Sequence, residues 1–263
     1  MNADQFSYWF IALTLTLIAV IYMLASRRLS DLRCTFWYEL RNPAIAERLR
    51  AVLDRREELE GLGRKPILLA SACYLVFGLL CGFRVLSPEL AYALACASSA
   101  FVLAWFFAGV RNRSQRRAAS LAPRRAVQVI PPLAYAGGLT ASILPLFFLT
   151  NTALRVPAII VSLACLVIVA AAWYTAGMAA VLVGDDIDYE LYVDERIRRS
   201  RVSAMLTFAY AVVPVFIAVV TRDAVSMPVY DYVFWLSMVL MFAFLVWYGV
   251  DFRRGRVPRT NGA

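Results

Sequence analysis

The chain has 263 residues, 62% of them apolar, and a mean hydropathy of +0.66, whereas soluble domains are roughly 45–50% apolar. It carries 27 Lys and Arg against 18 Asp and Glu, a formal net charge of +9, and no histidine. The composition excludes an ordinary water-soluble domain. The absence of histidine excludes haem ligation by His, His-based zinc sites and Ser-His-Asp hydrolysis.

Seven apolar stretches are long enough to cross a bilayer as helices, which takes roughly 20 apolar residues. None of them contains Asp, Glu, Lys or Arg. We therefore expect an all-α protein, a polytopic transmembrane helix bundle of seven spans. In chain order the predicted spans are 6–25, 66–83, 90–110, 126–150, 156–183, 202–220 and 232–250.

The basic residues predict the orientation of these spans, because Lys and Arg close to membrane helices are retained on the cytoplasmic side. Segments 26–65, 111–125 and 196–201 and the tail after Asp251 hold 24 of the 27 Lys and Arg residues. The N-terminus is therefore expected outside and the C-terminus in the cytoplasm. We expect a multi-pass protein of the bacterial inner (plasma) membrane, whose anionic headgroups attract these cations, and no nucleic-acid partner.

The spans and loops divide the chain into four regions. The first span is expected to be an uncleaved anchor, because its basic residues follow the apolar run, whereas a signal peptide carries them before it. The regions are an N-terminal anchor helix (1–25), a cytoplasmic loop (26–65), a six-helix transmembrane bundle of three hairpins (66–250) and a cytoplasmic tail (251–263). Whether the three hairpins are a true repeat is left open.

An amphipathic helix is predicted within the first cytoplasmic loop. Asn42 and Pro43 supply an N-cap and a proline at the first helical position for a helix over 44–59. Charged residues, Arg56 among them, are expected on the solvent-facing side. The apolar side has three alternative places: the lipid interface, the underside of the bundle, or a partner protein. It forms the candidate partner surface, made of Ile45, Leu49, Val52, Leu53 and Leu59.

The five cysteines do not predict a disulfide framework, since most lie inside predicted spans and no CxxC occurs. They are interpreted as small apolar packing residues. No cofactor is expected.

The fourth span is rich in glycine and proline and is expected to be kinked, because proline removes a helix hydrogen bond. Kinked helices line binding sites in transporters, whereas small residues more often allow close helix packing. Both interpretations stay open. The candidate solute path consists of Pro131, Pro132, Tyr135, Gly137, Gly138 and Pro145, with Tyr210 and Pro214 of the sixth span.

An acidic run follows the fifth span. The candidate divalent-metal ligands are Asp185, Asp186, Asp188 and Glu190, since carboxylates are the side chains that Mg²⁺ prefers. A structural interpretation explains the same region: the fifth helix ends at Gly184, a new helix begins after Asp185 or Asp186 and continues into the sixth span, and Asp194 pairs with Arg198 at i,i+4. Partner binding is a third possibility.

Two classes of function follow. The first is a non-enzymatic membrane protein, a scaffold or accessory subunit of a membrane complex, whose partners are other membrane or cytoplasmic proteins. The uncharged spans favour it, since coupled transport generally needs an ionisable group within the membrane. The alternative is transport, by a permease or channel for a neutral or lipid-like solute through the fourth helix. A Mg²⁺-dependent membrane enzyme that uses the acidic run, residues 185–195, is a distant alternative.

Overall fold

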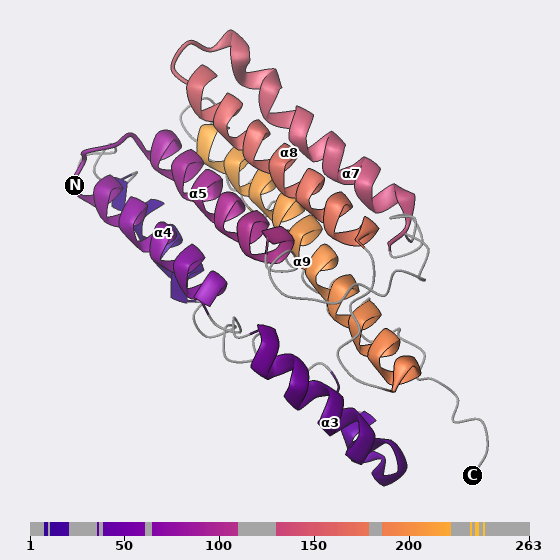
Figure 1. Ribbon diagram of the computed structural model, residues 1–263. Coiled ribbons are helices and arrows are strands. Elements are labelled where there is room, and N and C mark those ends of the chain that lie inside the picture. Colours follow the sequence, from indigo (N-terminus) through magenta and orange to yellow (C-terminus); the bar gives the residue numbers. More distant parts are fainter. Residues whose placement is uncertain are drawn as a thin grey trace.

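The computed structural model describes residues 8–9, 11–20, 36, 39–60, 65–109, 130–178 and 186–221, together with 232, 235, 236 and 239. Regular structure in this part of the chain is entirely helical (Figure 1). The elements are η1 (Glu39–Arg41), α3 (Pro43–Glu60), α4 (Lys65–Gly82), α5 (Pro88–Gly109), α7 (Pro132–Ile143), η3 (Leu144–Thr150), α8 (Arg155–Gly177) and α9 (Ile187–Thr221).

Four helices are long and apolar enough to cross a membrane. In the described residues the predicted all-α class is confirmed, and these four helices support a membrane protein, while the count of seven spans remains a prediction. Shorter apolar helices lie over Ile11–Val20 and Leu68–Gly82, and the last predicted span, 232–250, falls almost entirely outside the described residues. The four spans are Pro88–Phe107, Pro132–Thr150, Arg155–Gly177 and Ile187–Thr221.

Helix α8 lies in the middle of the bundle and packs against α5, α7 and α9, while α4 packs on α5 (Figure 1). Hydrogen bonds also join helices across the bundle, as where the Tyr92 hydroxyl of α5 donates to the Val212 carbonyl of α9 at 2.9 Å. Large apolar side chains such as Phe101, Trp105 and Leu163 are exposed on the outside. Such a surface suits contact with lipid rather than water.

Helix α9 is much longer than a bilayer is thick. Its 35 residues extend about 52 Å at about 1.5 Å per residue, whereas the hydrocarbon core is about 30 Å thick. The charged residues all lie in 187–201 and the apolar ones dominate 202–221. The first half therefore projects from the bundle (Figure 1), and the prediction that this helix runs continuously into the sixth span is confirmed.

The fourth span differs from its predicted bounds. The α-helix begins at Pro132, not at residue 126, because Pro131 holds an extended conformation with φ −55° and ψ 143° and Pro132 occupies the start of the helix. It ends at Ile143 and continues as the 3₁₀ helix η3, which contains Pro145. Proline lacks the donor that an α-helix needs, so the α-helix gives way to a 3₁₀ helix here; the kink stays a prediction.

The fifth span also ends earlier than predicted. Helix α8 stops at Gly177 and Met178 is extended, with ψ 146°, so the expected end at Gly184 is wrong. Residues 179–185 lie outside the described part of the chain. The carbonyl groups at this end of α8 have a side-chain partner on α9.

Candidate functional site: a buried charge network

Helix α3 begins as the sequence predicts. The backbone amide of Ala44 donates to the Asn42 side-chain oxygen at 3.1 Å, and Pro43 is the first helical residue. The side-chain oxygen of an N-cap satisfies one of the amides that the first turn leaves without a partner. The helix over Pro43–Glu60 thus confirms the predicted 44–59 to within a residue at each end.

The apolar side of α3 is covered by the projecting half of α9. Leu49 and Leu53 are completely buried, Val52 is nearly so, and Ile45 lies at the edge of the contact. Of the three alternative places for this side, the underside of the bundle is nearest to what the structure has: the side packs within the chain, on the projecting half of α9. The side chain of Leu59 is outside the described part. The cluster is formed by Phe36, Leu49, Val52, Leu53, Tyr189, Tyr192, Val193 and Ile197.

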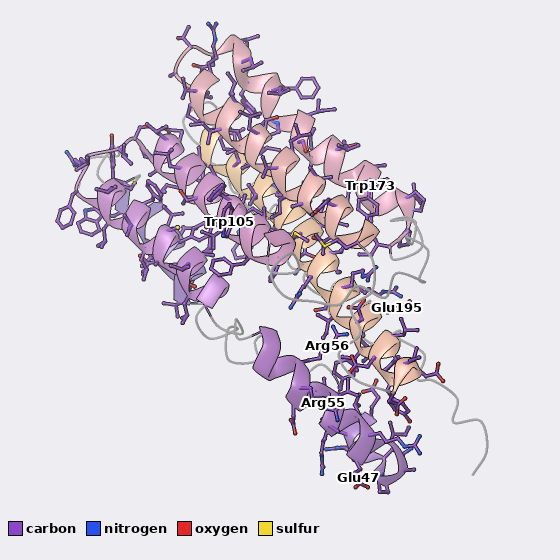
Figure 2. The ribbon with its side chains drawn as sticks, in the orientation of Figure 1. Glu47, Arg55, Arg56, Trp105, Trp173 and Glu195 are labelled. Carbon is purple, nitrogen blue, oxygen red and sulfur yellow. The ribbon has the colours of Figure 1, made fainter. Side chains whose placement is uncertain are left out.

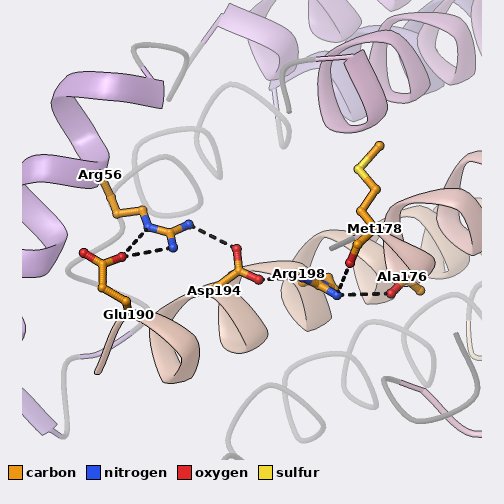
Figure 3. A network of polar contacts seen from close by, with 6 residues as sticks. All are labelled: Arg56, Ala176, Met178, Glu190, Asp194 and Arg198. Atoms are coloured by element: carbon orange, nitrogen blue, oxygen red, sulfur yellow. Dashed lines mark hydrogen bonds and ion pairs between the residues drawn. The ribbon is translucent and has the colours of Figure 1, made fainter. Parts of the chain in front are cut away.

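Arg56 joins α3 to α9 through two buried carboxylates (Figure 3). Its Nε and Nη2 donate to Glu190 Oε2 at 3.3 and 3.2 Å, and its Nη1 donates to Asp194 Oδ1 at 3.2 Å. The exposed fraction of all three side chains is 1% or less. Arg56 was expected on the solvent-facing side, and that expectation is wrong.

Arg198 continues the chain of contacts from α9 to α8 (Figure 3). Its Nη2 donates to Asp194 Oδ2 at 2.6 Å, which confirms the predicted i,i+4 pair. Its Nη1 donates to the carbonyl oxygens of Met178 at 2.6 Å and Ala176 at 3.3 Å. Backbone carbonyls in the last turn of a helix lack partners within that helix, so Arg198 completes the end of α8.

A second group of contacts ties η1 to α9. Glu39 Oε1 accepts from the Tyr192 hydroxyl at 2.8 Å and from Arg196 Nη1 at 2.5 Å. The Arg196 guanidinium also lies 5.4 Å from the centre of the Phe36 ring, within the range of a cation–π contact. Burial raises the pKa of the Tyr192 phenol, which therefore stays a neutral donor to Glu39.

The network of both groups contains three arginines and three carboxylates, so its formal charges cancel. Replacing a whole buried ion pair by apolar side chains is often neutral, but removing one partner leaves a buried unpaired charge at a cost of about 3–5 kcal/mol. The presence of the network is therefore weak evidence for stability, but the loss of any one member would leave a buried charge unpaired. We define the charge network as Glu39, Arg56, Glu190, Asp194, Arg196 and Arg198.

The candidate metal ligands do not come together in the described residues, among which no group of three or more Cys, Asp or Glu side chains could hold a metal ion. Glu190 is paired with Arg56, Asp188 is exposed and Asp186 is half-buried. Asp185 lies outside the described part of the chain. Of the three candidate ligands that the structure describes, only Glu190 is deeply buried, and it already has a cation beside it.

Part of the candidate solute path does come together, at the contact of α7 with α8 and α9. A Cβ built on Gly137 would lie 3.1 Å from the Tyr210 hydroxyl oxygen, and one built on Gly138 would lie 2.8 Å from Val169 Cγ2. Tyr210 also donates to the Ala134 carbonyl. The space beside both glycines is thus filled by neighbouring side chains, as the packing interpretation expects.

The remaining members of the candidate path are spread over α7, η3 and α9. Tyr135 is buried, and its ring meets the Trp173 ring of α8 edge to face at 4.9 Å. Pro131 and Pro132 lie at the start of α7, Pro145 in η3, and Pro214 inside α9.

Most of the charge network was not predicted from the sequence, although one signal was present. Arg56 follows Leu49 by seven residues and Leu53 by three, and this spacing places it on the apolar side of α3. Glu39 and Arg196 carry no comparable signal, because their partners are far away in the chain.

No protein-family model matches the chain, and no curated protein or solved structure matches it either.

Proposed function

We propose that the chain is a non-enzymatic scaffold or accessory subunit of a membrane complex, which presents the outer side of α3 to a partner protein. The observation that carries this proposal is the docking of α3. Its apolar side is buried on α9 and Arg56 fixes its end, while Glu47, Arg48 and Arg55 are exposed (Figure 2). A helix held in this way offers a charged surface with little loss of freedom on binding.

The proposal includes the predicted topology. We place α3 and the first half of α9 in the cytoplasm of a bacterial cell, with seven spans and the N-terminus outside, because Lys and Arg are concentrated in these loops. The arrangement of the helices supports this placement. Helix α3 and the charged half of α9 carry many of these cations, and they lie side by side (Figure 1).

The test is copurification from the native membrane in mild detergent. A variant with Arg48→Glu and Arg55→Glu reverses two exposed charges and leaves the buried side of α3 unchanged. We expect a stoichiometric partner to copurify with the wild type and to be lost from this variant, because charge complementarity selects partners. Arg155→Glu, an exposed cation at the other end of the bundle, is the matched control and should keep the partner.

Two results would contradict the proposal. The first is a wild-type protein that elutes from the native membrane without any stoichiometric partner. The second is a partner that stays bound equally well when the two charges of α3 are reversed.

A second candidate, a permease or channel for a neutral or lipid-like solute, is favoured by η3. The change from α-helix to 3₁₀ helix at Leu144 resembles the interrupted helices that form binding sites in transporters. Solute flux into proteoliposomes should then fall when Gly137 or Gly138 is enlarged. Unchanged flux, or no flux in the wild type for any neutral solute tested, would count against this candidate.

A further inference from the structure

Asp194 occupies a special position in the charge network, because its two oxygens serve different helices. Oδ1 accepts from Arg56 of α3 at 3.2 Å, and Oδ2 accepts from Arg198 at 2.6 Å, which in turn bonds the end of α8 (Figure 3). We propose that Arg56, Asp194 and Arg198 form a link that couples the docking of α3 to the end of α8. We call this end closed when its carbonyl groups are bonded to Arg198 and the last turn is ordered.

The last turn of α8 depends on Arg198. Arg198 Nη1 contacts the carbonyl oxygens of both Ala176 and Met178, groups that have no partner inside the helix. A cation at a helix C-terminus also interacts favourably with the helix dipole. Arg198 of α9 therefore acts as the C-terminal cap of α8. The last turn of α8 stays closed only while Arg198 keeps this position.

The position of Arg198 depends in turn on α3. When Arg56 is present, two arginines balance Glu190 and Asp194 in a site where every side chain is 1% exposed or less. Without Arg56, Glu190 and Asp194 lose the cation that they share. Excess buried charge is strongly unfavourable, so water must enter and hydrate the Asp194–Arg198 pair, which loosens Arg198 from the carbonyls of α8.

This coupling has two states: α3 docked with α8 closed, and α3 released with the last turn of α8 frayed. Coupling between two sites is reciprocal, so release of Arg198 must also weaken the docking of α3. The link goes beyond the proposed scaffold role, because it operates whatever molecule binds or moves α3. Any partner that pulls α3 from α9 would change the end of a membrane-spanning helix.

Hydrogen–deuterium exchange of the full chain in lipid nanodiscs tests this link. Arg56→Gln removes the buried cation, and Arg55→Gln removes the exposed cation next to it as a matched control. For Arg56→Gln we expect exchange in the peptide over 174–178 to be faster by about tenfold or more, because the free energy of local opening falls. Exchange in α5 should be unchanged, and Arg55→Gln should resemble the wild type.

The variant Arg198→Lys tests the reverse effect, from the end of α8 to the docking of α3. Lysine keeps the charge but cannot bond a carboxylate and two carbonyls through one planar group. Faster exchange in α3 is expected. The proposal is overturned if Arg56→Gln speeds exchange in α3 and the first half of α9 while 174–178 keeps its wild-type rate. It is equally overturned if protection in α5 falls as far as in α8, since a local link leaves α5 protected.

Discussion

Gly138 lies where α7 comes closest to its neighbours, and Gly138→Ala is therefore expected to destabilise the bundle. The new Cβ would lie 2.8 Å from Val169 Cγ2 and 3.4 Å from Leu206 Cδ2, whereas carbon atoms in contact prefer about 3.5–4.0 Å. Such overpacking costs about 1–3 kcal/mol, and the gain from replacing a helical glycine offsets only about 0.5–1 kcal/mol of it. We expect a net loss of up to about 2.5 kcal/mol.

The free energy of unfolding in mixed detergent micelles measures this effect. Gly177→Ala is the matched control, because a Cβ there would meet nothing within 4 Å, and its stability should equal or slightly exceed that of the wild type. Val169→Ala removes the atom that is too close, so the double variant should recover about 1 kcal/mol relative to the sum of the single changes. Equal stability of Gly138→Ala and Gly177→Ala would refute the packing argument.

Three further variants probe the other contacts. Leu53→Ala should weaken the docking of α3 by about 2–5 kcal/mol, seen as faster proteolysis within α3, whereas Arg50→Ala on the exposed side should change it little. Tyr192→Phe removes the hydroxyl that donates to the carboxylate of η1 and should lower the free energy of unfolding by about 1.5–3 kcal/mol, because the acceptor is charged; no change would indicate that water replaces it. Ser162→Ala removes the donor to the Ser142 carbonyl beside η3 and should cost about 0.6–2 kcal/mol, with faster amide exchange confined to η3 and the end of α7 as its signature.

Local signals predicted the helices well. The N-cap at Asn42 and the continuous helix α9 follow from residue types within a few positions of one another, and the structure confirms both. The distortion at Pro145 was predicted for the same reason. The start of α7 was predicted too early, although Pro131 followed by Pro132 marks a helix start, because apolar character alone was allowed to set the boundary.

The charge network could be predicted only in part. Asp194 and Arg198 are one helical turn apart, so their pairing follows from the sequence. Arg56 was expected on the solvent-facing side of α3 because it is charged. Its helical register, three residues after Leu53, instead places it on the apolar side. Its partner Glu190 is 134 residues away, and a single sequence holds no information on such a contact. Glu39 was missed for the same reason.

The separation between α3 and its partners has a consequence for biosynthesis. At about 5–20 residues per second, the 134 residues between Arg56 and Glu190 take roughly 7–27 seconds to synthesise. During this interval α3 has been made, but neither the surface that covers Leu49 and Leu53 nor the carboxylates that neutralise Arg56 yet exist. The nascent chain must shield this apolar helix in another way, and α3 docks only when synthesis has passed the first half of α9.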